Sequence, residues 1–311
     1  HCPVPLVLTL HDIIFMEPRK SGNKSLYQNM GWHYRRLVVP RILPQCRKII
    51  TVSHFERNRI REALRLPDGQ ITTVYNGYSR HFYPQEDPSP ITRKYIEESR
   101  YLFFLGNTDP KKNVPTHVKG NSLYREKSPK PLPLLIADIK EEILGSILRE
   151  QGIEHVRPHI VCPGYYPEYR LAYLYSGAFA FLNIVTGSFG IPLLEAMACG
   201  TPVVTSNTSS MPEVGGPGAL LCDPTDAKDI AHKILSLEKD PALYRQQIQY
   251  GLRRAKRFSW ETTATELLSI YKSIYHNAMI TGKDFVFTGL QPWDIPIGSN
   301  ARDIALEVSK A

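Results

Sequence analysis

Short apolar runs alternate with longer, more polar segments along most of this 311-residue chain. The runs are rich in β-branched, leucine and aromatic residues, which is typical of buried strands. Strands are predicted over residues 4–10, 47–52, 71–75, 100–105, 133–137, 159–162 and 178–184, and helices over 24–41, 53–66, 139–151, 167–176 and 260–275. Because strands that alternate with helices build parallel sheets from βαβ units, the chain is predicted to be an α/β protein.

The length of the chain predicts two domains, each large enough to bury its own core. Residues 84–90 contain Pro, Asp and Ser and are interpreted as the linker between them. The predicted divisions are therefore 1–90, 91–258, a helical segment at 259–278 and a separate segment at 279–311.

Residues 187–200 form a glycine-containing loop that leads directly into a predicted helix. Pro192 suits the first helical position, and Gly200 suits the left-handed position after a helix end. The N–H groups at a helix start bind anions such as phosphate. Glu195 lies one turn into the helix, where its carboxylate can accept hydrogen bonds from hydroxyl groups. Recognition of phosphate and hydroxyls together predicts a sugar-nucleotide site.

A second loop, at residues 106–113, carries two adjacent cations, Lys111 and Lys112. It follows a predicted strand, and a cation at a strand-to-helix turn can neutralise a phosphate oxygen. The alternative interpretation is a solvated lysine pair in a turn.

The segment at 187–200, with the Pro202-Val203-Val204 that follows, resembles the C-terminal half of retaining GT-B glycosyltransferases of glycosyltransferase family 4. The family pattern is roughly E-G-F-G-L-P-x-L-E-A-M-A-x-G-x-P-V, and the resemblance extends over residues 5–278. It implies two Rossmann-like lobes whose parallel sheets face a cleft. The first lobe would bind the acceptor, the second would bind the nucleotide sugar, and the helix at 259–278 would cross back to the first lobe.

The resemblance also implies roles for particular residues. Lys112 matches the more important cation of the family's G-x-x-x-P-R-K-N loop, and Lys111 stands where that loop has arginine. Glu195 matches a glutamate placed against the ribose. His11, at the end of the first apolar run, would orient the donor sugar, and backbone N–H groups would come from Ser188, Phe189, Gly190 and Ile191. On this basis His11 and Lys112 are the expected catalytic residues and the others are expected to bind the donor.

One departure from the family pattern falls at Gly187, where the family usually has a first glutamate against the transferred hexose. The expected activity is transfer of a hexose or deoxyhexose, with mannose as the first guess, from a nucleotide diphosphate sugar to a glycan or lipid-linked acceptor. No cofactor or metal is expected. The alternative is a catalytically weakened module that binds a sugar nucleotide or a glycan.

The whole net charge of +8 resides in the first 66 residues, which hold twelve Lys or Arg and four acids. A basic N-terminal lobe favours peripheral contact with an anionic membrane. A solvated helix face without a partner is the alternative, and nucleic acid is not expected because no stacking motif accompanies the charge. The five scattered cysteines indicate reduced thiols, so a cytoplasmic location is expected, at the inner face of the plasma membrane.

Both ends of the chain differ in character from its middle. The chain starts with His1-Cys2-Pro3 rather than methionine or a signal peptide, so we expect an N-terminal truncation and an incomplete first lobe. Residues 279–311 resemble the opening of a second bacterial glycosyltransferase. They are interpreted either as the start of a tandem enzyme or as a joined neighbouring gene.

Overall fold

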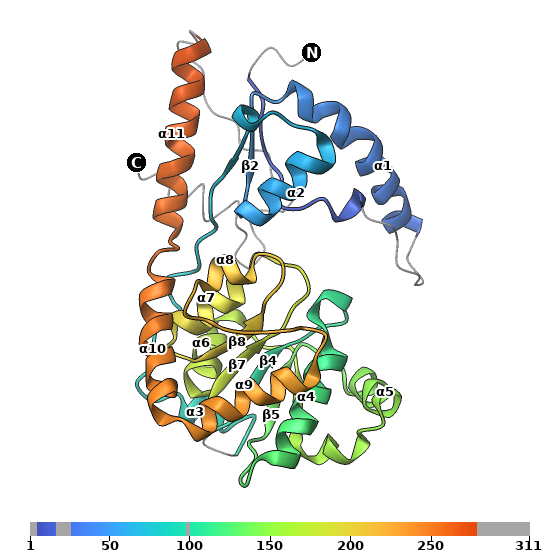
Figure 1. The fold of residues 1–311 in the computed structure, drawn as a ribbon, viewed down its shortest axis with the longest axis vertical. Helices are drawn as coiled ribbons and strands as arrows, with labels where there is room; N and C mark the ends of the chain where they lie inside the picture. The colour runs from blue at the N-terminus through green and yellow to red at the C-terminus, as the bar shows by residue number, and fades with distance from the viewer. Residues whose placement is uncertain (1–4, 17–25, 98–99, 279–311) are drawn as a thin grey trace. The chain divides into compact units, whose positions relative to one another are not determined.

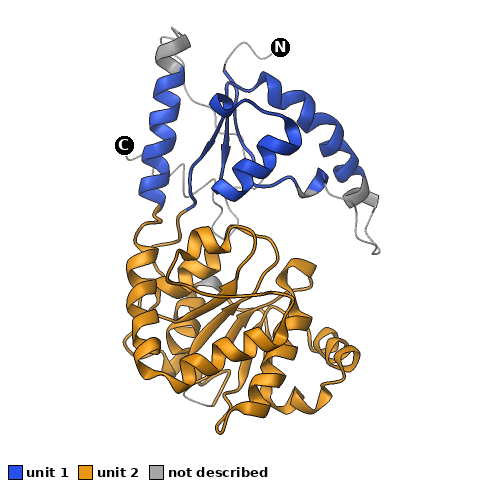
Figure 2. Cartoon of the chain, viewed as in Figure 1, with its two compact units in different colours: residues 1–76, 260–311 blue, residues 77–259 orange. Residues whose placement is uncertain are grey.

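The computed structural model describes residues 5–16, 26–97 and 100–278. These fold into two compact units, one from residues 1–76 with 260–311 and one from residues 77–259 (Figure 2). The predicted segment at 279–311 lies outside the described residues. Every strand pair in both units is parallel, which confirms the predicted α/β class.

The first unit is a three-stranded parallel sheet covered on both faces by helices (Figure 1). Its strand order is β1-β2-β3. Successive residues of β2 point to opposite faces, so Ile49 packs in the core that includes Ile60 of α2, whereas Ile50 packs against Leu267 of α11. The elements are β1 (Val7–Thr9), α1 (Leu26–Ile42), β2 (Lys48–Thr51), α2 (His54–Leu64), β3 (Ile71–Thr73) and α11 (Trp260–Ala278).

The start of α2 and the end of α1 lie close to where the sequence predicts them. The hydroxyl of Ser53 accepts a hydrogen bond from the Glu56 N–H at 3.1 Å, so Ser53 is the N-cap of α2. The helix predicted over 24–41 is α1, which ends at Ile42 and contains Pro40.

The second unit is a six-stranded parallel sheet in the order β6-β5-β4-β7-β8-β9. From β4 the chain adds strands in one direction and from β7 in the other, so the topological switch point lies between these two strands (Figure 1). The strands are β4 (Leu102–Leu105), β5 (Leu134–Ala137), β6 (Ile160–Gly164), β7 (Ala180–Asn183), β8 (Val203–Ser206) and β9 (Leu220–Cys222).

Helices of the second unit connect these strands, and their apolar faces complete its core. In that core Leu134 and Leu182 of the sheet are fully buried with Val118 and Ile230 of the helices. The helices are α3 (Ser89–Thr92), α4 (Val114–Lys127), α5 (Glu141–Gln151), α6 (Glu168–Gly177), α7 (Ile191–Ala198), α8 (Met211–Gly215), α9 (Ala227–Lys239) and α10 (Pro241–Ala255). Short 3-10 turns lie at Ile14–Met16, Leu43–Gln45, Asp68–Gln70, Pro110–Lys112 and Glu154–His159.

The division between the units falls between Asn76 and Gly77, before the proline-containing segment at 84–90. That segment is attached to the second unit, since the Gln85 N–H donates to the Ser176 hydroxyl at 3.1 Å. A β-carbon on Gly177 would lie only 2.9 Å from the Thr92 side chain, so α3 packs closely against α6.

Candidate functional site

Two loops leave the sheet of the second unit at the switch point. Residues 106–113 follow β4, and residues 184–190 follow β7, its neighbour in the sheet. The Thr186 N–H donates to the Lys111 carbonyl oxygen at 3.0 Å, so the two loops are directly joined. Ligands of open α/β sheets bind at such a position, outside the carboxyl ends of the strands.

The loop after β4 turns tightly and presents its two lysines. The Asp109 carboxylate accepts a hydrogen bond from the Lys111 N–H at 2.9 Å, and Asn113 adopts a left-handed conformation with φ of 54°. Asparagine tolerates that conformation better than most residues. The Lys111 side chain lies beside the loop that follows β7, since its Cδ would be 3.9 Å from a β-carbon on Gly187.

Lys112 is half-buried among carboxylates. Burial lowers the pKa of its ammonium group, and Asp109, Asp138 and Glu195 act in the opposite direction. A partly desolvated ammonium group interacts more strongly with an anion than a fully hydrated one, because water screens it less. Lys112 is thus suited to bind a strongly charged group such as a diphosphate.

Glu195 projects from α7, and a tyrosine fixes its carboxylate. The buried hydroxyl of Tyr175, on α6, donates to Glu195 Oε2 at 3.0 Å. Burial and the neighbouring Glu195 raise the pKa of Tyr175 well above its ordinary value, so the phenol stays protonated and remains a donor. The carboxylate is therefore held in one orientation at the edge of the site.

In the loop before α7, Thr186 and Ser188 are exposed, whereas Phe189 and Gly190 are buried. Gly190 is the N-cap of the helix, with φ of 99°, and its N–H donates to the Ser188 hydroxyl at 3.2 Å. The Phe189 side chain is buried, so this residue can offer only its backbone to a ligand. The predicted left-handed conformation of Gly200, after the helix, is confirmed by its φ of 76°.

Neither packing nor backbone conformation requires a glycine at position 187. Gly187 lacks the positive φ that favours glycine, and a β-carbon there would meet only the Lys111 Cδ, at an ordinary 3.9 Å. A larger side chain would fit at this position. The missing side chain is therefore a feature of the site and not a consequence of the fold.

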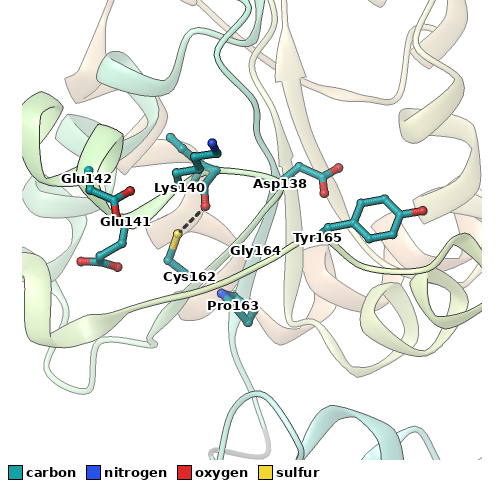
Figure 3. Close-up of a pocket in the computed structure, with 9 residues that line it drawn as sticks. Asp138, Lys140, Glu141, Glu142, Cys162, Pro163, Gly164 and Tyr165 are labelled. Atoms are coloured by element: carbon teal, nitrogen blue, oxygen red, sulfur yellow. Dashed lines mark hydrogen bonds between the residues drawn. The ribbon is translucent and has the colours of Figure 1, made fainter.

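An open pocket of about 500 Å³ lies at the carboxyl ends of β5 and β6. Asp138 and Tyr165 lie at one end of it and Glu141 and Glu142 at the other (Figure 3). The charge of Asp138 also acts to raise the pKa of Lys112. The pocket therefore adjoins the loop at residues 106–113, the lysine loop. Its volume is within the range of small-molecule sites.

A buried histidine lies behind the lysine loop. The Ile184 N–H donates to His117 Nε2 at 3.1 Å, so the neutral ring carries its proton on Nδ1, which donates to the Asn113 carbonyl oxygen at 3.0 Å. The ring also stacks on Phe104, with centroids 3.7 Å apart. Burial lowers the pKa of His117 to about 4; Lys112 acts in the same direction, while the Asn113 and Leu182 backbones oppose it.

The lowered pKa of His117 predicts acid sensitivity. Below pH 6.5, the ordinary pKa of histidine, His117 binds a proton in the unfolded chain but stays neutral in the folded protein until the pH is near 4. Stability is therefore complete above pH 6.5 and falls by up to about 3 kcal/mol as the pH drops from 6.5 towards 4. Urea denaturation across this range should show a shallower loss for His117→Phe than for the wild type. Equal pH dependence in the two proteins would contradict the assignment.

Comparison with known proteins identifies the family. A family model described as glycosyl transferases group 1 matches residues 91–254, and one described as glycosyltransferase family 4 matches residues 1–81. O-antigen chain mannosyltransferase B of Escherichia coli is 31% identical over 280 residues, which are 86% of this chain and 70% of that protein. The chain belongs to the group 1 glycosyl transferases.

Other relatives and solved structures agree with this family and fold. O-antigen chain mannosyltransferase RfbU of Salmonella typhimurium is 25% identical over 258 residues, which are 78% of this chain and 64% of that protein. Sucrose-phosphate synthase from Thermosynechococcus elongatus superposes with a TM-score of 0.71 at 22% identity, over 87% of this chain and 68% of that one. HepE of Anabaena, solved with UDP and glucose, superposes with a TM-score of 0.71 at 16% identity, over 86% of this chain and 72% of that one. The predicted GT-B fold is thereby confirmed.

As a group 1 glycosyl transferase, the protein is an enzyme that uses a sugar donor. The second unit brings together the predicted residues Lys111, Lys112 and Glu195 with the loop at 188–191. His11 follows β1 in the first unit.

Several residues at this site were not predicted from the sequence, namely Asp138, Tyr175, Asn113 and His117. Asp138 had a usable signal, because it directly follows the predicted strand at 133–137 and so lies at a carboxyl edge. Within the part of the chain that the structure describes, no group of three or more His, Cys, Asp or Glu side chains could hold a metal ion. Over those same residues, no helix combines the length and apolarity needed to cross a bilayer.

Proposed function

We propose that this enzyme transfers a hexose, with mannose as the first candidate, from a nucleoside diphosphate sugar to a glycan or lipid-linked acceptor. The observation that carries the proposal is the cluster at the switch point, where the half-buried Lys112 lies among carboxylates that include Glu195. The mannosyltransferases among its relatives support mannose and a role in polysaccharide synthesis.

The diphosphate of the donor is proposed to bind between Lys112, Lys111 and the backbone N–H groups of residues 188–191. A helix start and two cations complement its negative charge. When the bond between the sugar and the phosphate breaks, charge develops on the leaving nucleoside diphosphate. Lys112 would stabilise that charge, which is how preorganised electrostatics accelerate transfer.

The nucleoside is proposed to extend from the diphosphate towards β5 and β6. Glu195, held by Tyr175, would accept hydrogen bonds from the ribose hydroxyls. The pocket beside Asp138 and Tyr165 has room for the base. Carboxylate acceptors at one side and an aromatic ring at the other suit the polar edge and the flat face of a nucleoside.

The transfer is proposed to retain the anomeric configuration and to need no metal ion. The acceptor hydroxyl attacks the anomeric carbon from the face that the diphosphate leaves, and its proton passes to a phosphate oxygen of the leaving group. No enzymic nucleophile is then needed. His11 is proposed to orient the sugar through a hydrogen bond.

The second candidate, a module that binds a sugar nucleotide with little turnover, is favoured by the missing side chain at Gly187. The deciding experiment offers GDP-mannose, UDP-glucose and UDP-N-acetylglucosamine with oligosaccharide and lipid-linked acceptors, with and without EDTA. We expect nucleoside diphosphate release and a product of retained configuration by NMR. Binding of nucleotides without release from any donor would support the second candidate instead.

We further propose a cytoplasmic enzyme that meets the anionic inner face of the membrane through α1. Met30, Tyr34 and Leu37 are 68%, 65% and 57% exposed and recur at the spacing of one helix face. The helix contains no acidic residue, whereas Arg35 and Arg41 are exposed on it. Apolar side chains flanked by cations are typical of helices that lie in a membrane interface.

Replacing Leu37 with serine is expected to weaken binding to vesicles about tenfold, because the buried area of one leucine is lost. Sedimentation with phosphatidylcholine vesicles, with or without phosphatidylglycerol, measures the effect. Tyr169→Ser removes an equally exposed apolar side chain from α6, 64% exposed, and should change nothing. Equal binding by the wild type and both variants would contradict the proposed membrane contact through α1. Binding that does not depend on phosphatidylglycerol would also contradict it.

A further inference from the structure

The lysine loop is fastened to the end of β7 by the side chain of Asn113. Its amide group donates to the Ile184 carbonyl oxygen at 3.3 Å and to the Pro224 carbonyl oxygen at 2.7 Å. The Thr116 hydroxyl donates to the remaining amide oxygen at 2.7 Å. One residue thus connects the loop after β4 with the segments that follow β7 and β9.

His117 completes this attachment from the next helical turn. Its Nε2 accepts from the Ile184 N–H, and its Nδ1 donates to the Asn113 carbonyl oxygen. His117 therefore binds the backbone N–H of Ile184, and Asn113 binds its carbonyl oxygen. The backbone bond from Thr186 to Lys111 lies between the same two loops. Ile184 begins the segment that leads to Gly190.

Only a neutral imidazole fits these demands. The ring is fully buried and must be an acceptor on one side and a donor on the other. Phenylalanine could keep the stacking on Phe104 but would leave the buried Ile184 N–H without this partner, which costs about 1–3 kcal/mol. The Asn113 carbonyl oxygen would keep its bond from the backbone N–H of residue 117, at 3.2 Å.

We propose that His117 is a positioning residue for sugar-nucleotide binding. Together with Asn113 it holds Lys111 and Lys112 at the distance from the α7 loop that a diphosphate requires. It acts through the lysine loop and does not touch the substrate. This inference rests on the proposed function, because it assigns the loop to the donor.

The test measures the affinity of the full chain for UDP and for GDP by calorimetry. His117→Phe and Asn113→Gly are each expected to weaken the better-bound nucleotide about tenfold, whereas His117→Gln, which can still accept from Ile184, should lose less. Asn113→Gly keeps the left-handed backbone accessible. Val118→Ala is the matched control, because it removes buried volume from the same helix but none of these hydrogen bonds.

A structural role alone would lower the unfolding free energy without this loss of affinity, as Val118→Ala should. In a Lys112→Ala background the further effect of His117→Phe should be smaller than in the wild type, because one of the two positioned cations is gone. If His117→Phe does not fold, the nucleotide affinities of Asn113→Gly and His117→Gln test the proposal instead. Normal nucleotide affinity in the folded variants, with Lys112→Ala impaired, would overturn the role of His117 only. Normal affinity in Lys112→Ala, or no binding by the wild type, would overturn the donor site itself.

Discussion

Lys112→Ala is expected to lower the rate of sugar transfer by about 100- to 1,000-fold, the usual effect of removing one group that stabilises charge in a transition state. The same change should weaken binding of the nucleoside diphosphate. The effect is large because Lys112 is half-buried, so water cannot readily replace its charge. Folding should be little affected, since removal of the ammonium group also relieves its partial desolvation.

Initial rates with saturating donor, together with calorimetry, measure both effects. Lys239→Ala is a suitable control, because Lys239 is an exposed cation at the end of α9. Lys112→Arg should retain part of the activity, since it keeps the charge but not the compact geometry of an ammonium group. An unchanged rate and affinity in Lys112→Ala, with an intact circular dichroism spectrum, would refute the assignment.

Gly190→Ala is expected to destabilise the protein by about 1–3 kcal/mol and to reduce transfer at least tenfold. A φ of 99° is strained for any residue with a side chain, and the new β-carbon would lie 2.8 Å from the Met211 Cε. Met211 is fully buried and receives a hydrogen bond from Asn183, so it cannot move freely. Strain relief would displace the loop that is proposed to bind the diphosphate.

Gly187→Ala provides the matched comparison in the same loop. Its φ is ordinary and its nearest neighbour would be 3.9 Å away, so stability should hardly change. Urea denaturation of both variants measures the difference. If Gly190→Ala were as stable and active as Gly187→Ala, the strained conformation of the α7 N-cap would not be required.

The fold of the second unit follows closely from its sequence pattern. Strands predicted at 100–105, 133–137, 159–162 and 178–184 overlap β4, β5, β6 and β7, although each observed strand is shifted or shorter by a few residues. Buried runs of this kind are easy to detect because both faces of a parallel sheet are covered. Their ends are less certain, since pairing with a neighbour decides where a strand stops.

The candidate site was only partly predictable. Lys111, Lys112 and Glu195 were found because they occur in short segments whose spacing resembles a known family. Tyr175 and His117 could not be found in this way. A tyrosine or histidine within a helical segment is usually part of the core, and its partner becomes visible only when the strands are in order.

The sequence by itself determined the local features of this protein, which are the alternation of strands and helices, the Ser53 cap and the glycine loop before α7. Each of these depends on residues a few positions apart, so backbone sterics and nearby hydrogen bonds suffice. Only the tertiary structure decided that β5, β4 and β7 lie side by side, and therefore that Asp138, Lys112 and Glu195 lie close together. Periodicity shows that a strand is buried but not which strand lies beside it, because that choice depends on packing between distant segments.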